Sequence, residues 1–107
     1  MTASDGQLDA RVLLANVDLK LGDRAAAEDQ FNAVLLLDPA NHDALLGLAQ
    51  EQSKEQRFTD VVDLLGPHVK GASAELLQLL MQAYVNLGRT ADAEKVRTQL
   101  RASQRRR

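Results

Sequence analysis

The sequence predicts an all-α protein made of three antiparallel helix pairs that follow one another as repeats. The composition is 45% hydrophobic but only 3% aromatic, which favours helices over strands. Apolar residues recur at spacings of three and four, as on one helix face. Similar turn sequences stand at Gly22, Gln56 and Gly88, 34 and 32 residues apart. We therefore expect three units of helix, short turn and helix.

Boundary residues place six helices along the chain. Asp23 can cap the second helix, and Ser4 with Gln7 has capping-box spacing for the first. The segment 38–41, Asp-Pro-Ala-Asn, ends the second helix and caps the third. The expected helices are residues 7–21, 24–37, 42–54, 57–66, 74–87 and 90–103.

The second half of the chain contains one irregular helix. Ser73 and Thr90 are expected to cap the fifth and sixth helices. Gly66 and Pro67 fall where the third turn of the fourth helix should be. Because a proline inside a helix removes a hydrogen bond and clashes with the preceding turn, we expect this helix to be short or kinked.

The predicted organisation is a single domain over residues 7–103. A leader of residues 1–6 precedes it, and a basic tail of residues 104–107 follows. The expected repeats cover about 8–41, 42–73 and 74–103.

The pattern resembles the tetratricopeptide repeat, whose signature is an aromatic residue, a Leu-Gly pair and Tyr, followed by Ala, an aromatic residue and Pro. The first repeat has Arg11, Leu14, Ala15, Asp18, Ala27, Phe31 and Pro39 at these places. The second has Leu45, Leu48, Ala49, Gln52, Val61 and Leu65, and the third has Leu77, Leu80, Met81, Tyr84, Ala93 and Arg97. The resemblance covers about residues 8–101 and implies a right-handed helical solenoid of three degenerate repeats.

The resemblance also implies a peptide-binding groove, because the first helix of each pair lines the concave surface in that family. The implied groove residues are Val12, Leu13, Asn16, Lys20, Leu46, Gln50, Lys54, Leu79, Gln82 and Asn86. The ninth position of each repeat carries an amide, namely Asn16, Gln50 or Gln82. Amides donate and accept hydrogen bonds, so they suit the backbone of a bound peptide. The alternative is that they are ordinary polar residues on wet helix faces.

One ligand of the family is disfavoured. Chaperone adaptors hold a C-terminal carboxylate with a clamp of Lys, Asn and Arg side chains. The corresponding residues here are Val12, Asn16, Gly47, Glu75 and Leu79. Only Asn16 fits, and Glu75 would repel a carboxylate.

The two ends of the predicted array differ. In the last helix Ala93, Val96 and Leu100 form one narrow apolar stripe, so this helix can close the array. The first helix is apolar on two faces, with Leu8, Val12, Ala15 and Leu19 in addition to Ala10, Leu13, Leu14 and Val17. Either an upstream repeat or domain covers the second face, or the helix associates with a second copy.

Charge and composition disfavour several functions. The chain has no cysteine, and its histidines, His42 and His68, stand at expected loop or cap positions, so no catalytic, metal or cofactor site is predicted. Before Arg101 there are nine basic and fifteen acidic residues, which disfavours nucleic acid. Neither a signal peptide nor a membrane helix is predicted, so we expect a cytoplasmic chain; the alternative is a fragment of an exported protein.

The functional prediction is a non-catalytic scaffold that binds a partner polypeptide or helix in the groove. The chain is then expected to be the C-terminal part of a larger repeat protein. The alternative is a homo-oligomerisation or domain-docking module that uses the apolar first helix.

Overall fold

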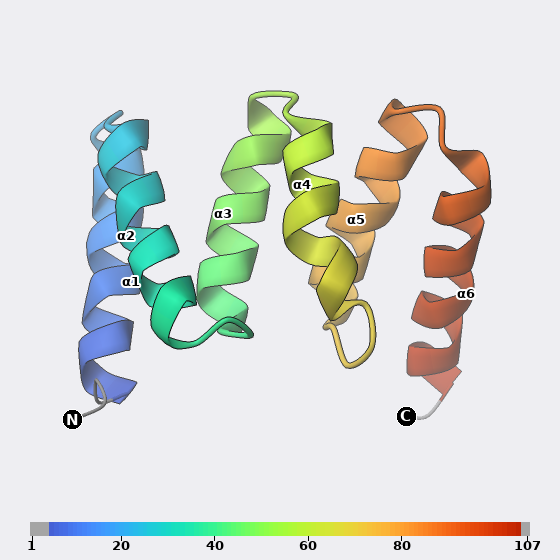
Figure 1. Ribbon diagram of the computed structural model, residues 1–107, viewed down its shortest axis with the longest axis horizontal. Helices are drawn as coiled ribbons and strands as arrows, with labels where there is room; N and C mark the ends of the chain where they lie inside the picture. Colours follow the sequence, from blue (N-terminus) through green and yellow to red (C-terminus); the bar gives the residue numbers. More distant parts are fainter. Residues whose placement is uncertain (1–4, 106–107) are drawn as a thin grey trace. The chain divides into compact units, whose positions relative to one another are not determined.

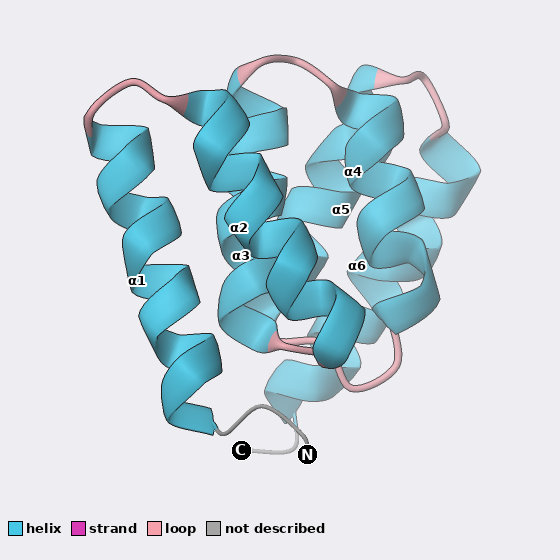
Figure 2. Ribbon diagram, turned by 60° about the vertical axis from the view of Figure 1, so that its left-hand side comes forward, coloured by secondary structure: helices cyan, strands magenta, loops and turns pink. Residues whose placement is uncertain are grey.

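The computed structural model describes residues 5–105, and within this range the chain folds into six α-helices and one short 3₁₀ helix, with no strand (Figures 1 and 2). The elements are α1 (Asp5–Lys20), α2 (Arg24–Leu37), α3 (His42–Lys54), α4 (Phe58–Leu65), η1 (Gly66–His68), α5 (Ala74–Asn86) and α6 (Thr90–Arg105). Every helix bound lies within two residues of its prediction, which confirms the all-α fold class.

The helix ends refine the predicted leader and tail. The first helix begins at Asp5, so the last two residues of the expected leader are helical. The last helix continues to Arg105, so the first two residues of the expected tail are helical as well. Ser4, the predicted first cap, lies outside the described residues.

Helix α4 is short, as predicted. It ends at Leu65 and passes into the 3₁₀ turn Gly66–His68. Pro67 has no N–H to donate and disfavours the α region for the residue before it. Gly66 has no Cβ and adopts φ −50° and ψ −47° in that place.

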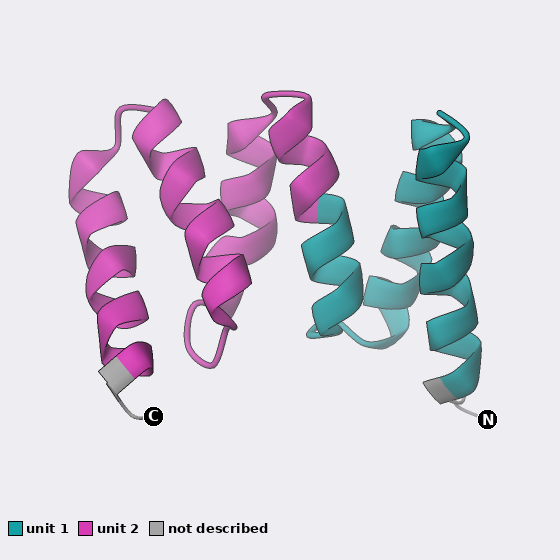
Figure 3. Ribbon diagram, turned by 180° about the vertical axis from the view of Figure 1, so that it is seen from behind, with its two compact units in different colours: residues 1–48 teal, residues 49–107 magenta. Residues whose placement is uncertain are grey.

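The chain divides into two compact units, residues 1–48 and 49–107 (Figure 3). In unit 1, α1 packs against α2. In unit 2, α5 packs against both α4 and α6. The division falls inside α3, and the predicted single domain with its three repeat bounds stays a prediction.

The three predicted turns share one local structure, centred on Gly22, Gln56 and Gly88. Each of these residues has a positive φ, of 83°, 61° and 75° respectively. In all three turns, its N–H donates to the carbonyl three residues earlier at 3.0 Å. The next N–H donates to the carbonyl five residues before it at 2.8 Å. These bonds define a Schellman motif, and Gln56 adopts the left-handed conformation despite its Cβ.

Three of the predicted helix caps are confirmed. Asp23, Asn41 and Ser73 each accept a hydrogen bond from the backbone N–H three residues later, at 3.1, 3.0 and 3.2 Å. The predicted cap at Thr90 is wrong, because Thr90 is the first residue of α6. The carbonyl of Arg89 already accepts the first helical bond, from the N–H of Ala93 at 3.1 Å.

Several small residues are buried on the paired helices. Ala15 and Ala27 are fully buried in unit 1. In unit 2 the buried small residues of this kind are Ala49, Val61 and Ala93. These residues let paired helices approach each other.

Helix α6 has a single apolar face, as predicted. Ala93, Val96 and Leu100 are buried, whereas Lys95 and Arg97 are exposed. Among the described residues, no helix combines the length and apolar character needed to cross a membrane.

Candidate functional site

Helix α1 is apolar on its exposed side as well as on its buried side. Leu8, Val12 and Ala15 belong to the core. The exposed apolar residues are Ala10, Leu13, Leu14 and Val17, followed directly after the helix by Leu21; we call these five residues the α1 outer face. Successive residues of an α-helix are rotated by about 100° around its axis, so these five side chains point, on average, to the side of α1 opposite the core residues. Apolar residues of a helix usually face a packing partner, and among the described residues nothing covers this second face of α1.

Among the described side chains of α1, the charged ones lie on the two flanks of the α1 outer face. Arg11 and Asp18 lie on one flank, and Asp9 and Lys20 lie on the other. The exposed strip between the flanks therefore carries no charge.

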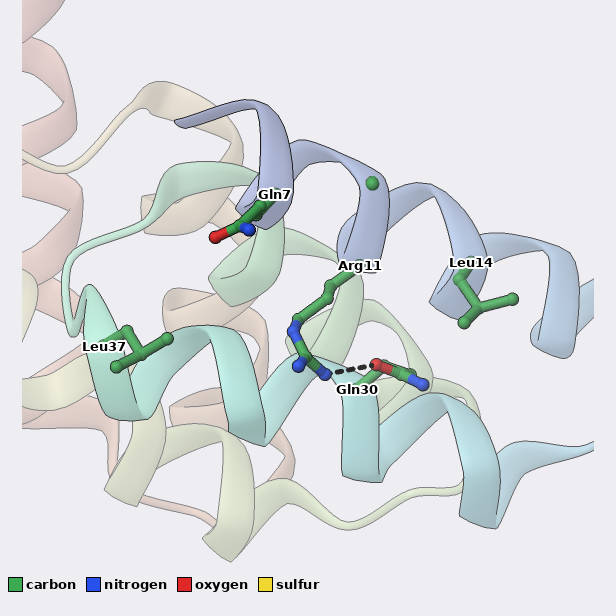
Figure 4. A pocket seen from close by; sticks show the side chains of 6 residues that line it. Gln7, Arg11, Leu14, Gln30 and Leu37 are labelled. Carbon is green, nitrogen blue, oxygen red and sulfur yellow. Dashed lines mark hydrogen bonds between the residues drawn. The ribbon is translucent and has the colours of Figure 1, made fainter. Parts of the chain in front are cut away.

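Helix α2 extends the apolar surface through Leu37, which is exposed. A depression of about 430 Å³ lies between the two helices. It is lined by Gln7, Ala10, Arg11 and Leu14 of α1 and by Gln30 and Leu37 of α2. We call it the α1–α2 depression (Figure 4).

One polar contact borders the α1–α2 depression. The Arg11 Nη1 donates to Oε1 of Gln30 at 3.3 Å, as the dashed line in Figure 4 shows. Both groups are exposed. The bond therefore links α1 to α2 beside the α1–α2 depression, which both residues line.

The other two predicted repeats provide an internal comparison for the α1 outer face. The turn spacings of 34 and 32 residues make Leu14 equivalent to Leu48 of α3 and Leu80 of α5. Leu14 is 47% exposed, whereas Leu48 and Leu80 are 3% and 1% exposed. The same contrast separates Ala10 from Ala44 and Leu76, and Val17 from Glu51 and Ala83. The positions of Ala10, Leu14 and Val17, which are uncovered on α1, are therefore buried on α3 and α5.

The predicted amides are exposed at each of their three positions. Asn16 belongs to unit 1, and Gln50 and Gln82 belong to unit 2. Each is therefore described within its own unit. Asn86 lies beside Gln82, because its Nδ2 donates to the Gln82 carbonyl at 2.8 Å.

The remaining predicted groove residues vary in exposure. Leu13, Lys20 and Lys54 are exposed, and Leu46 and Leu79 are partly buried. Val12 departs from the prediction, because it is only 8% exposed. It belongs to the core side of α1, where the family's position pattern had placed a ligand contact.

The two histidines lie at the ends of helical elements. The Nδ1 of His42 lies 3.3 Å from Oδ1 of Asp43 at the exposed start of α3. His68 ends the 3₁₀ turn. The described part of the chain contains no group of three or more His, Asp or Glu side chains that could hold a metal ion.

A second depression, of about 490 Å³, lies within unit 2. Its lining mixes charged residues such as Lys70 and Lys95 with Val96 and Tyr84. The Arg89 guanidinium stands over the Tyr84 ring, 4.9 Å from the centroid. This mixed lining contrasts with the uncharged strip on α1.

Comparison with known proteins returned no significant match. No family model, no curated protein and no solved structure matches this chain.

Sequence reasoning found the α1 outer face but missed the contribution of α2. Leu36 and Leu37 are both exposed. The available signal was the run Leu35-Leu36-Leu37 at the end of the second predicted helix. Three consecutive leucines cannot all lie on one side of a helix, so at least one had to face outward.

Proposed function

We propose that this chain is a non-catalytic, tetratricopeptide-like repeat module that binds a polypeptide through the α1 outer face and the α1–α2 depression. The main support for this proposal is the difference in exposure between Leu14 and its equivalents Leu48 and Leu80. Three apolar positions, those of Ala10, Leu14 and Val17, are exposed on α1 and buried at the equivalent places of α3 and α5, so they form a surface that a partner can cover.

The repeat assignment is supported by local geometry. The Schellman turns at Gly22, Gln56 and Gly88 share the same bonds at repeat-like spacing. Small buried residues, such as Ala15 and Ala49, stand at the family's close-packing positions. In this proposal the three helix pairs form a right-handed solenoid.

The proposed partner supplies an amphipathic helix. The helix of unit 2 that is equivalent to α1 is α5, and α5 packs against two other helices, α4 and α6. A straight apolar strip along α1 suits a helix with apolar residues at spacings of three and four. Burying such side chains contributes about 25 cal/mol per Å² of apolar surface.

The amide groove is the competing site. Asn16, Gln50 and Gln82 are exposed and could each bond a peptide backbone. The α1 outer face is favoured because exposed apolar surface carries more binding free energy than exposed amides, which already bond to water.

A displayed library of helical peptides, selected on the wild-type chain, tests the proposal. We expect Leu14→Glu/Val17→Glu to abolish binding of the selected peptides. We expect Asn16→Ala/Gln50→Ala/Gln82→Ala to retain it. Circular dichroism of both variants checks that they remain helical.

The two variants together decide between the sites. Loss of binding only in the amide variant would move the site to the groove. Unchanged binding in the face variant would contradict the proposal.

A further inference from the structure

We infer that the helix covering the α1 outer face is α1 of a second copy of this chain, packed antiparallel to the first. This inference rests on the proposed function and names the partner of the same site. It is carried by the self-complementarity of α1 in shape and in charge.

The apolar strip has the spacing of a coiled-coil seam. Ala10, Leu14, Val17 and Leu21 are separated by four, three and four residues, which is the alternation of d and a positions in a heptad. When two copies of α1 pack antiparallel, each of these four residues forms one layer with a residue of the other copy. Ala10 then faces Leu21 of the second copy, and Leu14 faces its Val17.

The α1–α2 depression provides the hole for one of these layers. A knob from a facing helix enters a space bounded by four side chains. Gln7, Ala10, Arg11 and Leu14 bound such a space at positions i, i+3, i+4 and i+7, and the small Ala10 leaves it open. Leu21, which is 78% exposed, is the side chain that antiparallel packing brings to the Ala10 of the other copy.

The charges on one flank also match. Arg11 and Asp18 are seven residues apart and both occupy the e position of this heptad. In an antiparallel pair, equivalent flanks face each other in reverse order. Arg11 of each copy therefore meets Asp18 of the other, which gives two ion pairs.

The opposite flank is compatible with the same arrangement. Leu13 and Lys20 occupy the g positions, where the aliphatic stem of Lys20 covers Leu13 of the other copy while its ammonium stays in water. A parallel pair would instead place Ala10 against Ala10 and leave a gap. It would also leave Arg11 and Asp18 without an opposite charge on the facing g positions.

The size of the interface implies reversible association. The 16 residues of α1 extend about 24 Å. The area that one helix face and Leu37 can bury lies toward the small end of the range for specific protein–protein interfaces. We therefore expect a dimer that forms at roughly micromolar concentrations and above.

Charge exchange tests this pairing in the full chain. Sedimentation velocity over a concentration series should show the wild-type chain passing from monomer to dimer. Arg11→Asp places acidic side chains opposite each other, and Asp18→Arg places basic ones opposite each other. Each single variant should weaken the dimer by on the order of tenfold or more.

Two further samples make the test specific. An equimolar mixture of the single variants should form a heterodimer, because every facing pair is then opposite in sign. The double variant Arg11→Asp/Asp18→Arg should likewise regain the wild-type association. Asp63→Arg, an exposed charge change on α4 of unit 2, is the control and should leave the association unchanged.

A wild-type chain that stays monomeric throughout the series would overturn this inference, as would a mixture of single variants that fails to associate. The peptide selection described above separates this failure from that of the proposed function. Selected peptides that still require Leu14 and Val17 would leave the docking face standing with a different partner.

Discussion

Gly47 in α3 is the residue whose replacement tests the core of unit 1 most sharply. A Cβ added at Gly47 would lie 2.7 Å from Cε1 and 3.2 Å from Cε2 of Phe31, and closer still to Cζ. Phe31 is fully buried, so its ring has no open space into which to move. Gly47→Ala therefore overpacks the contact between α2 and α3 within unit 1.

The magnitude follows from two opposing effects. Overpacking a dense core costs about 1–3 kcal/mol, and alanine gains about 1 kcal/mol over glycine inside a helix. The added Cβ would meet a buried ring at less than 3.0 Å, which places the overpacking cost in the upper part of this range, about 2–3 kcal/mol. We therefore expect Gly47→Ala to lower the free energy of unfolding by a net of about 1–2 kcal/mol. This corresponds to a fall in Tm of roughly 4–16 °C for a chain of this size.

Urea unfolding followed by circular dichroism measures this change, and a double-mutant cycle with Phe31→Leu identifies its cause. In the Phe31→Leu background, Gly47→Ala should be neutral or stabilising, because the ring that it meets is gone. Equal destabilisation in both backgrounds would refute the reasoning, and so would stabilisation of the wild type by Gly47→Ala.

Three further predictions concern stability and use the same urea assay. Gln56→Gly should stabilise the chain by about 0.5–1 kcal/mol because it relieves a left-handed residue, and Gly88→Ala should destabilise it by about 1 kcal/mol or more; equal effects at both turns would contradict this. Gln52→Met should stabilise by about 1 kcal/mol, because the buried Gln52 Oε1 has no hydrogen-bond partner among the described residues; a loss of stability would show that the amide is satisfied. Leu80→Ala should lower the free energy of unfolding by about 2–5 kcal/mol because Leu80 is buried, whereas Leu14→Ala should lower that of the monomer by less than about 1 kcal/mol because Leu14 is exposed. Similar losses for the two variants would mean that Leu14 is not exposed.

Helix positions were predictable because local signals agreed with one another. The Leu-Gly turns, the caps at Asp23 and Ser73 and the Pro67 interruption each act within a few residues of the chain. Gln56 was identified as a turn residue only through its spacing from the two glycines, since its own side chain does not favour a positive φ. The cap was assigned to Thr90 in place of Arg89 because sequence signals locate a helix start only to within one or two residues.

The surface was less predictable than the helices. Periodicity showed that α1 has two apolar faces, but only the packing against α2 decided that Val12 is buried and Leu13 exposed. The role of Leu37 beside Ala10 depends on two helices meeting, which spacing along one helix does not encode. The amides at Asn16 and Gln50 lie in different units, so their joint role stays a prediction.

Site-specific photo-crosslinking at position 14 tests the central claim, that the α1 outer face is a docking surface, most directly. A photoreactive amino acid replaces Leu14 in the full chain, and the same substitution at Leu87, an exposed leucine of unit 2, provides the control. The claim predicts that position 14 crosslinks to a second copy of the chain in a discrete product, and that this product is lost when Val17→Glu is added. It predicts no such product from position 87. Equal crosslinking at both positions, or an adduct that survives Val17→Glu, would contradict it.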